Sequence, residues 1–153
     1  MEPIEEFRYL VLAAQREGAR ALAAGLKPHD LTPSQAEAIA VLRDAGRALS
    51  VREIGDRLVC EGGSPSRLMS TLAKKGLVES MPDPADGRAT LLSLTDAGVE
   101  AGQAVAQVER ELYAGLGLFV SGAQLENVLP VLRQLVQAAP TGQALERRIA
   151  DKG

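Results

Sequence analysis

The stretch SPSRLMSTLAKKGLVES, residues 64–80, decides how the rest of the chain is interpreted. Ser64 followed by Pro65 is a typical helix start, because a hydroxyl caps free amides and proline fits the first helical position. A helix from there to Lys75 turns by about 100° per residue, so its side chains separate into two faces. The apolar face holds Pro65, Leu68, Leu72 and, near its edge, Met69, and the polar face holds Ser66, Arg67, Ser70, Thr71 and Lys74. The segment is therefore predicted to be an amphipathic helix.

The polar face of this helix contains no Asp or Glu. An ordinary surface helix carries Glu and Lys pairs three or four residues apart, and this face has none. Short hydroxyl side chains allow close approach to DNA, arginine can bond guanine through two hydrogen bonds, and a carboxylate would be repelled by phosphate. The alternative is a helix that merely faces solvent. The composition of the face favours contact with the phosphates and base edges of a duplex.

A β-hairpin is predicted directly after this helix. Residues 77–81 and 90–94 are two short strand-like segments on either side of a loop rich in Pro, Asp and Gly. The loop carries Arg88, and a cation on a protruding loop can enter a minor groove while Asp86 orients it. The alternative is an arginine that pairs with Asp86 or Asp83.

The remaining segments are predicted to be helices. Hydroxyl caps followed three residues later by Gln or Glu mark three further helix starts, at Thr32, Ser50 and Ser121. The expected order is four helices, the hairpin, a long helix and a further helix. The fold class is mainly α (α+β): a winged helix-turn-helix with a two-stranded wing, flanked by N- and C-terminal helices.

Composition narrows the classes of function. The 153 residues suit one domain, and an aromatic content of 3% argues against stacking platforms for single-stranded nucleic acid. The net charge of −3 is uneven, because residues 1–42 and 93–153 each carry a net −2 while residues 43–92 carry one more base than acid. The acidity therefore belongs to the flanking segments and not to the predicted helix and loop.

No catalytic or metal-binding constellation is visible. Cys60 is the single cysteine and His29 the single histidine, which excludes an intramolecular disulfide and a Cys/His zinc site. No nucleophile lies beside a base, so the chain is predicted not to be an enzyme and to need no cofactor or metal. The N-terminus is acidic and no apolar run approaches the length of a membrane span, so we expect a cytoplasmic protein with no membrane partner.

The chain resembles the MarR family of transcriptional regulators. The resemblance is carried by LTPSQAEAIAVLRDAG at 31–46, by LSVREIGDRL at 49–58 with SRLMSTLAKKGLVES at 66–80, and by PDPADGRATLLSLTDAG at 82–98. The KKGLV turn and the D-x-R wing followed by LT-x-x-G are specific in combination. Flanking helices of matching length and position extend the resemblance over nearly the whole chain.

The resemblance implies a homodimer that binds a palindromic site in double-stranded DNA, as a repressor that responds to a ligand. Residues 1–30 would be an N-terminal dimerisation helix, 31–95 the DNA-binding lobe, and 96–153 a long helix with C-terminal dimerisation helices. The DNA contacts carried over by position are Ser64, Ser66, Arg67, Ser70, Thr71, Lys74 and the wing arginine Arg88.

Two further expectations concern small molecules and oxidation. Small aromatic or anionic effectors of the family bind between the dimer helices and the winged helix, so His29, Arg16 or Arg20 are candidates to face such a pocket. Cys60 is expected to pack as a small apolar residue of the turn. The alternatives are a redox-sensing regulator that uses Cys60, and a winged-helix module that binds protein and not DNA.

Overall fold

The computed structural model describes residues 1–60 and 63–153, and most of them are helical. The helices are α1 (Pro3–Leu26), a short 3-10 helix η1 (Lys27–His29), α2 (Pro33–Ala45), α3 (Val51–Gly55), α4 (Pro65–Lys74), α5 (Asp96–Gly117), α6 (Gly122–Val136) and α7 (Pro140–Lys152). The strands are β1 (Leu49–Ser50), β2 (Val78–Pro82) and β3 (Thr90–Leu94). The predicted fold class is confirmed.

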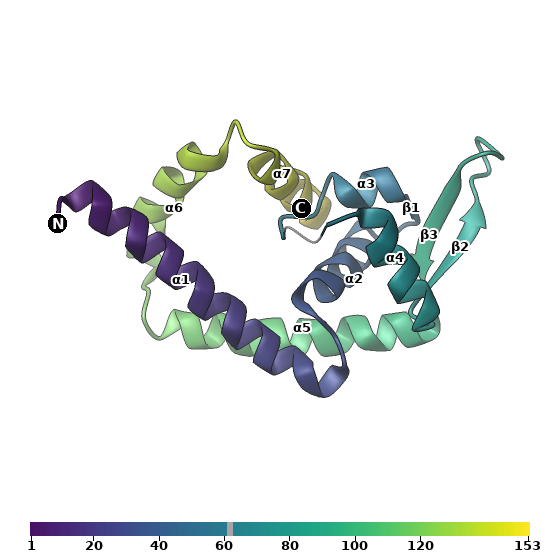
Figure 1. Ribbon diagram of the computed structural model, residues 1–153, viewed down its shortest axis with the longest axis horizontal. Coiled ribbons are helices and arrows are strands. Elements are labelled where there is room, and N and C mark those ends of the chain that lie inside the picture. Colours follow the sequence, from purple (N-terminus) through teal and green to yellow (C-terminus); the bar gives the residue numbers. More distant parts are fainter. Residues whose placement is uncertain (61–62) are drawn as a thin grey trace.

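The strands form one antiparallel sheet in the order β1-β3-β2. Val78 pairs with Leu94 at the base of the hairpin and Pro82 with Thr90 toward its tip, which confirms the predicted wing. β1 was not predicted, and it adds a third strand by pairing Leu49 with Leu92. Figure 1 shows the hairpin projecting beyond the body of the lobe, beside α4.

The hydrophobic core lies inside the lobe, where α2 is surrounded by α4, α5 and the sheet. Residues from five different elements are completely or almost completely buried there, namely Ile39, Leu49, Ile54, Leu72 and Val105. Each fully buried aliphatic side chain of this size contributes about 1.5–3 kcal/mol. The lobe therefore has a core of its own, which fixes α4 and the wing relative to each other.

Capping explains where several helices begin. Thr32, Ser50 and Ser121 each accept a hydrogen bond from the amide three residues on, while the Gln or Glu there bonds back to the cap amide. These three capping boxes are confirmed. The helix start predicted at Ser64 is also confirmed, although the Ser64 side chain makes no capping hydrogen bond within the described residues.

The helices α1 and α6 bury few of their side chains. In Figure 1, α1 and α5 run along one side of the molecule, and α6 and α7 return along the other, so that α7 packs against α2. Leu26 is the one buried residue of α1, and α6 has none. Among the described residues, no single helix is long and apolar enough to cross a membrane; α5 and α6 reach that length only as a pair bent by 108°.

Candidate nucleic-acid interface

Helix α4 presents the predicted polar face to solvent. Met69 and Leu72 are buried at 2% and 0% exposure and hold the helix against the lobe. The predicted contact residues are all exposed: Ser64, Ser66, Arg67, Ser70, Thr71 and Lys74. The turn after the helix needs the glycine of the KKGLV motif, because Gly76 has a φ of +74° that other residues rarely adopt. The sequence pattern therefore placed both faces of α4 correctly.

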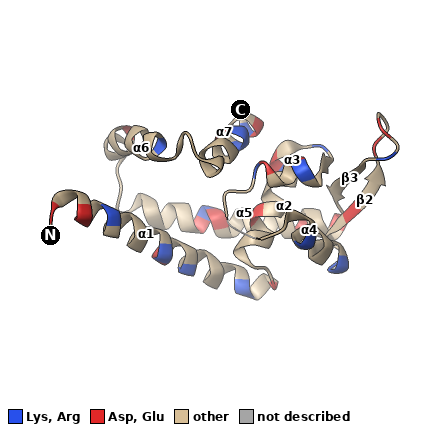
Figure 2. Cartoon of the chain, turned by 45° about the horizontal axis from the view of Figure 1, so that its top comes forward, with Lys and Arg blue, Asp and Glu red and all other residues tan. Residues whose placement is uncertain are grey.

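The basic residues of this segment have two different roles. Outside residues 61–62, which the structure does not describe, no ion pair engages Arg67 or Lys74. Lys75 instead lies 3.1 Å from the Asp30 carboxylate and bonds the Asp30 carbonyl, so it fastens the end of α4 to η1. Figure 2 shows basic and no acidic positions on α4. Two cations thus remain available to an anionic partner on an acid-free helix.

The N-terminal turn of α4 is also suited to an anion. It contains no acidic residue, and Pro65 occupies the first helical position. The first amides of a helix lack intrahelical acceptors and carry a partial positive charge, which favours phosphate. Since the Ser64 hydroxyl does not cap the helix, it remains available for contact as well.

The wing places its arginine at an exposed turn. The Asp86 carboxylate accepts a hydrogen bond from the Arg88 amide at 3.1 Å, and the Asp83 carboxylate accepts one from the Ala85 amide at 2.8 Å. Asp86 therefore shapes the backbone that carries Arg88. No ion pair of the Arg88 guanidinium is present in the described part of the chain, contrary to the alternative that it pairs with Asp86 or Asp83.

Arg52 is a further exposed cation that the sequence reasoning did not single out as a contact. It lies on α3, the short helix that packs against α4. Arg47 and Arg57, by contrast, are paired with Glu53 and Asp151. The signal available in the sequence was only the surplus of bases in residues 43–92, which did not separate paired from unpaired arginines.

The prediction that Cys60 packs as an apolar residue of the turn is wrong, because Cys60 is exposed. It lines a surface hollow of about 950 Å³ together with Leu58, Val59 and the first residues of α7. Partial burial of the thiol and the nearby Glu37 carboxylate raise the pKa of Cys60 to about 11. The neutral thiol is therefore favoured, whereas a reactive cysteine needs a lowered pKa.

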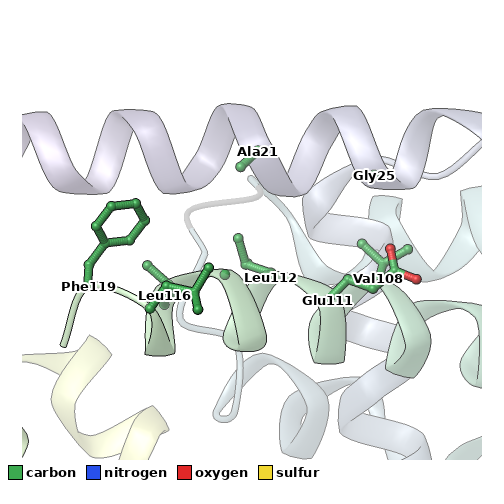
Figure 3. Close-up of a pocket in the computed structure, with 9 residues that line it drawn as sticks. Ala21, Gly25, Val108, Glu111, Leu112, Leu116 and Phe119 are labelled. Atoms are coloured by element: carbon green, nitrogen blue, oxygen red, sulfur yellow. The ribbon is translucent and has the colours of Figure 1, made fainter. Parts of the chain in front are cut away.

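The three residues suggested for an effector pocket lie apart from the apolar pocket between α1 and α5. Arg16, Arg20 and His29 are exposed, and Arg20 pairs with Glu17 at 2.8 Å. Figure 3 shows the pocket, which has a volume of about 390 Å³ and is lined by Ala21, Gly25, Val108, Glu111, Leu112, Gly115, Leu116, Leu118 and Phe119. Its lining is apolar except for one carboxylate.

Two other features of the described chain bear on chemistry. Among the described residues, no group of three or more His, Cys, Asp or Glu side chains could hold a metal ion. Glu37, which sequence reasoning did not single out, is a buried carboxylate of α2 that accepts hydrogen bonds from the turn before α4. In the sequence, Glu37 stands out as a single acidic residue within the apolar run at residues 36–42, which could have indicated a buried carboxylate.

Comparison with known proteins agrees with this geometry. Residues 31–98 match the family model of a winged helix DNA-binding domain. The transcriptional repressor IacR of Pseudomonas putida is 27% identical over 103 residues, which cover 67% of this chain. The matched region is 61% of IacR, so this chain spans less than two thirds of that relative's length. The regulator SarZ of Staphylococcus haemolyticus is 21% identical over 84% of this chain and 85% of its own.

Solved structures show the same fold at low sequence identity. A MarR variant from E. coli in complex with operator DNA superimposes with a TM-score of 0.76 at 23% identity, over 89% of this chain and 99% of that one. An organohalide-sensing transcriptional regulator bound to 2,4-dichlorophenol gives 0.79 at 16% identity, over 92% and 83%. The MepR–DNA complex of S. aureus gives 0.76 at 21% identity, over 86% and 97%.

Proposed function

We propose that the chain is a winged-helix regulator of the MarR type, which binds a palindromic site in double-stranded DNA as a homodimer and represses transcription. It acts by binding and not by catalysis. Because its partner is DNA, its place of action is the cytoplasm.

The observation that carries this proposal is the exposed, acid-free face of α4. Arg67 and Lys74 can neutralise phosphates or bond bases, and Ser66, Ser70 and Thr71 can approach the groove closely. The Thr71 hydroxyl already donates to the Arg67 carbonyl at 3.0 Å, so it is positioned to accept a hydrogen bond from a base amino group. Arg88 on the projecting wing would reach the adjacent minor groove.

The flanking helices support a homodimer. A large set of apolar side chains on them is between 40% and 84% exposed, which includes Ile4, Tyr9, Leu10, Leu116, Leu118, Phe119, Leu125, Leu129 and Leu135. So many exposed large apolar side chains on helices outside the lobe indicate an interface. We therefore assign residues 1–30 and 96–153 to dimerisation and residues 31–95 to DNA binding, so that two lobes place their α4 helices in successive major grooves.

The apolar pocket between α1 and α5 supports a response to a small aromatic ligand. Its lining favours an apolar ring over an anion, because Glu111 is its one charged side chain. The solved structure that contains 2,4-dichlorophenol shows that a protein of this fold can bind such a ring. The pocket lies between two helices that we assign to dimerisation. A ligand there would therefore change the spacing of the two lobes and weaken DNA binding at both half-sites together.

Two alternative functions make different predictions. Redox sensing at Cys60 is disfavoured by its raised pKa, and it predicts that Cys60→Ser abolishes a response to peroxide while DNA binding remains. A protein-interaction module predicts no affinity for DNA and no dependence of affinity on salt.

The direct test measures binding to a DNA fragment from upstream of the protein's own gene by fluorescence anisotropy. Arg67→Ala should weaken binding by roughly 10- to 100-fold if it reads a base. Arg88→Ala should lower the slope of log K against log salt by about one if its guanidinium neutralises one phosphate. Arg110→Ala is the matched control, since Arg110 lies on α5 and bonds Gln107. Unchanged binding by both test variants would overturn the assignment of the interface.

A further inference from the structure

The buried carboxylate of Glu37 bonds the turn that precedes α4 in the sequence. Glu37 lies on α2 and is 8% exposed. Its Oε1 accepts a hydrogen bond from the Val59 amide at 2.8 Å, and its Oε2 accepts one from the Cys60 amide at 2.8 Å. Both amides belong to the connection between α3 and α4, outside any helix. The backbone at Val59 and Cys60 is thus held by a side chain of another helix.

The charge of Glu37 is balanced from the last helix of the chain. Arg148 of α7 donates from Nη1 to Glu37 Oε1 at 3.0 Å, and its side chain is 19% exposed. A buried carboxylate is costly unless it is paired, and loss of one partner leaves the other charge uncompensated. Arg148 therefore belongs to the same set of contacts as the turn, although it follows Cys60 by 88 positions in the sequence.

Further contacts keep α7 in this place on the lobe. Asp151 lies 2.6 Å from Arg57, which follows α3, and Lys152 lies 3.2 Å from Asp44 of α2. The Arg147 guanidinium donates to the Asp56 carbonyl at 3.1 Å. The helix α7 packs against α2, and Figure 1 shows the C-terminus at the lobe. The ion pairs that α7 makes among the described residues thus go to α2 and to Arg57, just after α3.

We propose that Glu37 and Arg148 are positioning residues for DNA binding, through which α7 sets the location of the turn and hence of α4. This inference rests on the proposed function. Glu37 acts on the backbone of the turn, and Arg148 acts through Glu37. Since α7 follows α6 after a short connection, a shift of the dimerisation helices reaches α4 by this route without any contact between α7 and DNA.

The test compares Arg148→Met with Arg148→Lys and with Arg147→Met. Arg147→Met removes the same charge from the same helix but leaves Glu37 untouched. Amide hydrogen exchange is measured at Val59 and Cys60, and DNA affinity by anisotropy, both well below the melting temperature. Arg148→Met should speed exchange at these two amides and weaken DNA binding by roughly 3- to 30-fold, the range of coupling through such networks. Arg148→Lys should restore part of both. Arg147→Met removes one contact of α7 with the Asp56 carbonyl, and it should change both clearly less than Arg148→Met does; an equal effect of the two variants would show that Glu37 is not the route.

A second variant separates positioning from a general loss of stability. Glu37→Gln keeps the shape of the side chain, and combining it with Arg148→Met should add little to the effect of either change alone, because both interrupt one unit. Two results would overturn the inference. In the first, the Val59 and Cys60 amides of Arg148→Met exchange at the wild-type rate. In the second, they exchange faster but the variant binds DNA with full affinity. Absence of DNA binding by the unmodified protein would instead overturn the proposed function, and the exchange result would still decide whether Arg148 holds the turn.

Discussion

Gly98, in the first turn of α5, lies directly against the carbonyl oxygen of Leu77, the residue just before β2. A β-carbon at position 98 would overlap that oxygen. The same oxygen accepts a hydrogen bond from the Thr95 amide at 3.1 Å. The glycine of the LT-x-x-G motif is thus required by a close backbone contact between the residue before β2 and the first turn of α5.

Gly98→Ala is expected to destabilise the protein by about 1–3 kcal/mol, because backbone must move to admit the methyl group. Thermal unfolding followed by circular dichroism measures the effect as a lowered melting temperature. Gly87→Ala serves as the control, since a β-carbon there meets nothing within 4 Å. Equal melting temperatures for the two variants would contradict this account of the motif.

Thr95→Ala should lower the free energy of unfolding by about 1–2 kcal/mol. The Thr95 hydroxyl accepts from the Gly98 amide at 3.0 Å, which caps α5, and it donates to the Gly76 carbonyl at 2.6 Å. Both bonds need only the hydroxyl, so Thr95→Ser should lie within about 0.5 kcal/mol of the wild type. Urea denaturation of the two variants distinguishes the hydroxyl from the methyl group, and an equal loss of stability in both would rule out these bonds as the cause.

Glu53 makes stability depend on pH in the acid range. Hydrogen bonds from the Ser50 amide and the Arg47 guanidinium lower the pKa of Glu53 from 4.5 to about 2. A carboxyl whose pKa is lower in the folded state stabilises fully above pH 4.5, and this contribution is lost as the pH falls toward 2. Because the pair is partly exposed to solvent, we expect it to contribute about 1 kcal/mol.

The measurement compares Glu53→Gln with the wild type by urea denaturation at pH 6 and pH 3. The variant should be less stable at pH 6, and the difference should shrink at pH 3. Glu100→Gln, an exposed carboxyl of α5, provides the control and should show no such convergence. A constant difference at both values of pH would show that Glu53 stabilises through packing and not through its charge.

Phe119→Asp is expected to produce monomers that no longer bind DNA. Phe119 is 83% exposed in the single chain, so its replacement removes little packing within one subunit and acts mainly on association. Size-exclusion chromatography with light scattering reports the mass. Met81→Asp introduces the same charge at an exposed apolar position of the wing and should leave the dimer intact. A dimeric Phe119→Asp variant would remove this residue from the interface.

The elements that could be predicted from the sequence are those with strong local signals. The capping boxes at Thr32, Ser50 and Ser121 place three helices, because a cap acts over only three residues. The separation of faces in α4 and the Pro/Asp/Gly loop of the wing are local as well. These signals sufficed to predict the winged helix-turn-helix and the exposure of its candidate contacts.

The features that escaped prediction depend on contacts between distant residues. β1 has only two residues, too few to show a period, and it exists because Leu49 pairs with Leu92. α7 begins at Pro140 after Ala139, which provides no side-chain cap, and it is held by ion pairs with the lobe. The hydrogen bond between Glu37 and the Val59 amide and the ion pair between Lys75 and Asp30 join residues that are far apart in the sequence. A single sequence does not reveal such tertiary contacts.

Selection of bound sequences from a random pool of duplex DNA tests the central claim most directly, because it examines binding, symmetry and spacing together. The account predicts enrichment of an inverted repeat whose half-sites lie about one helical turn, roughly 10 base pairs, apart. Failure to enrich any sequence, or enrichment of a single half-site without a symmetric partner, would contradict it.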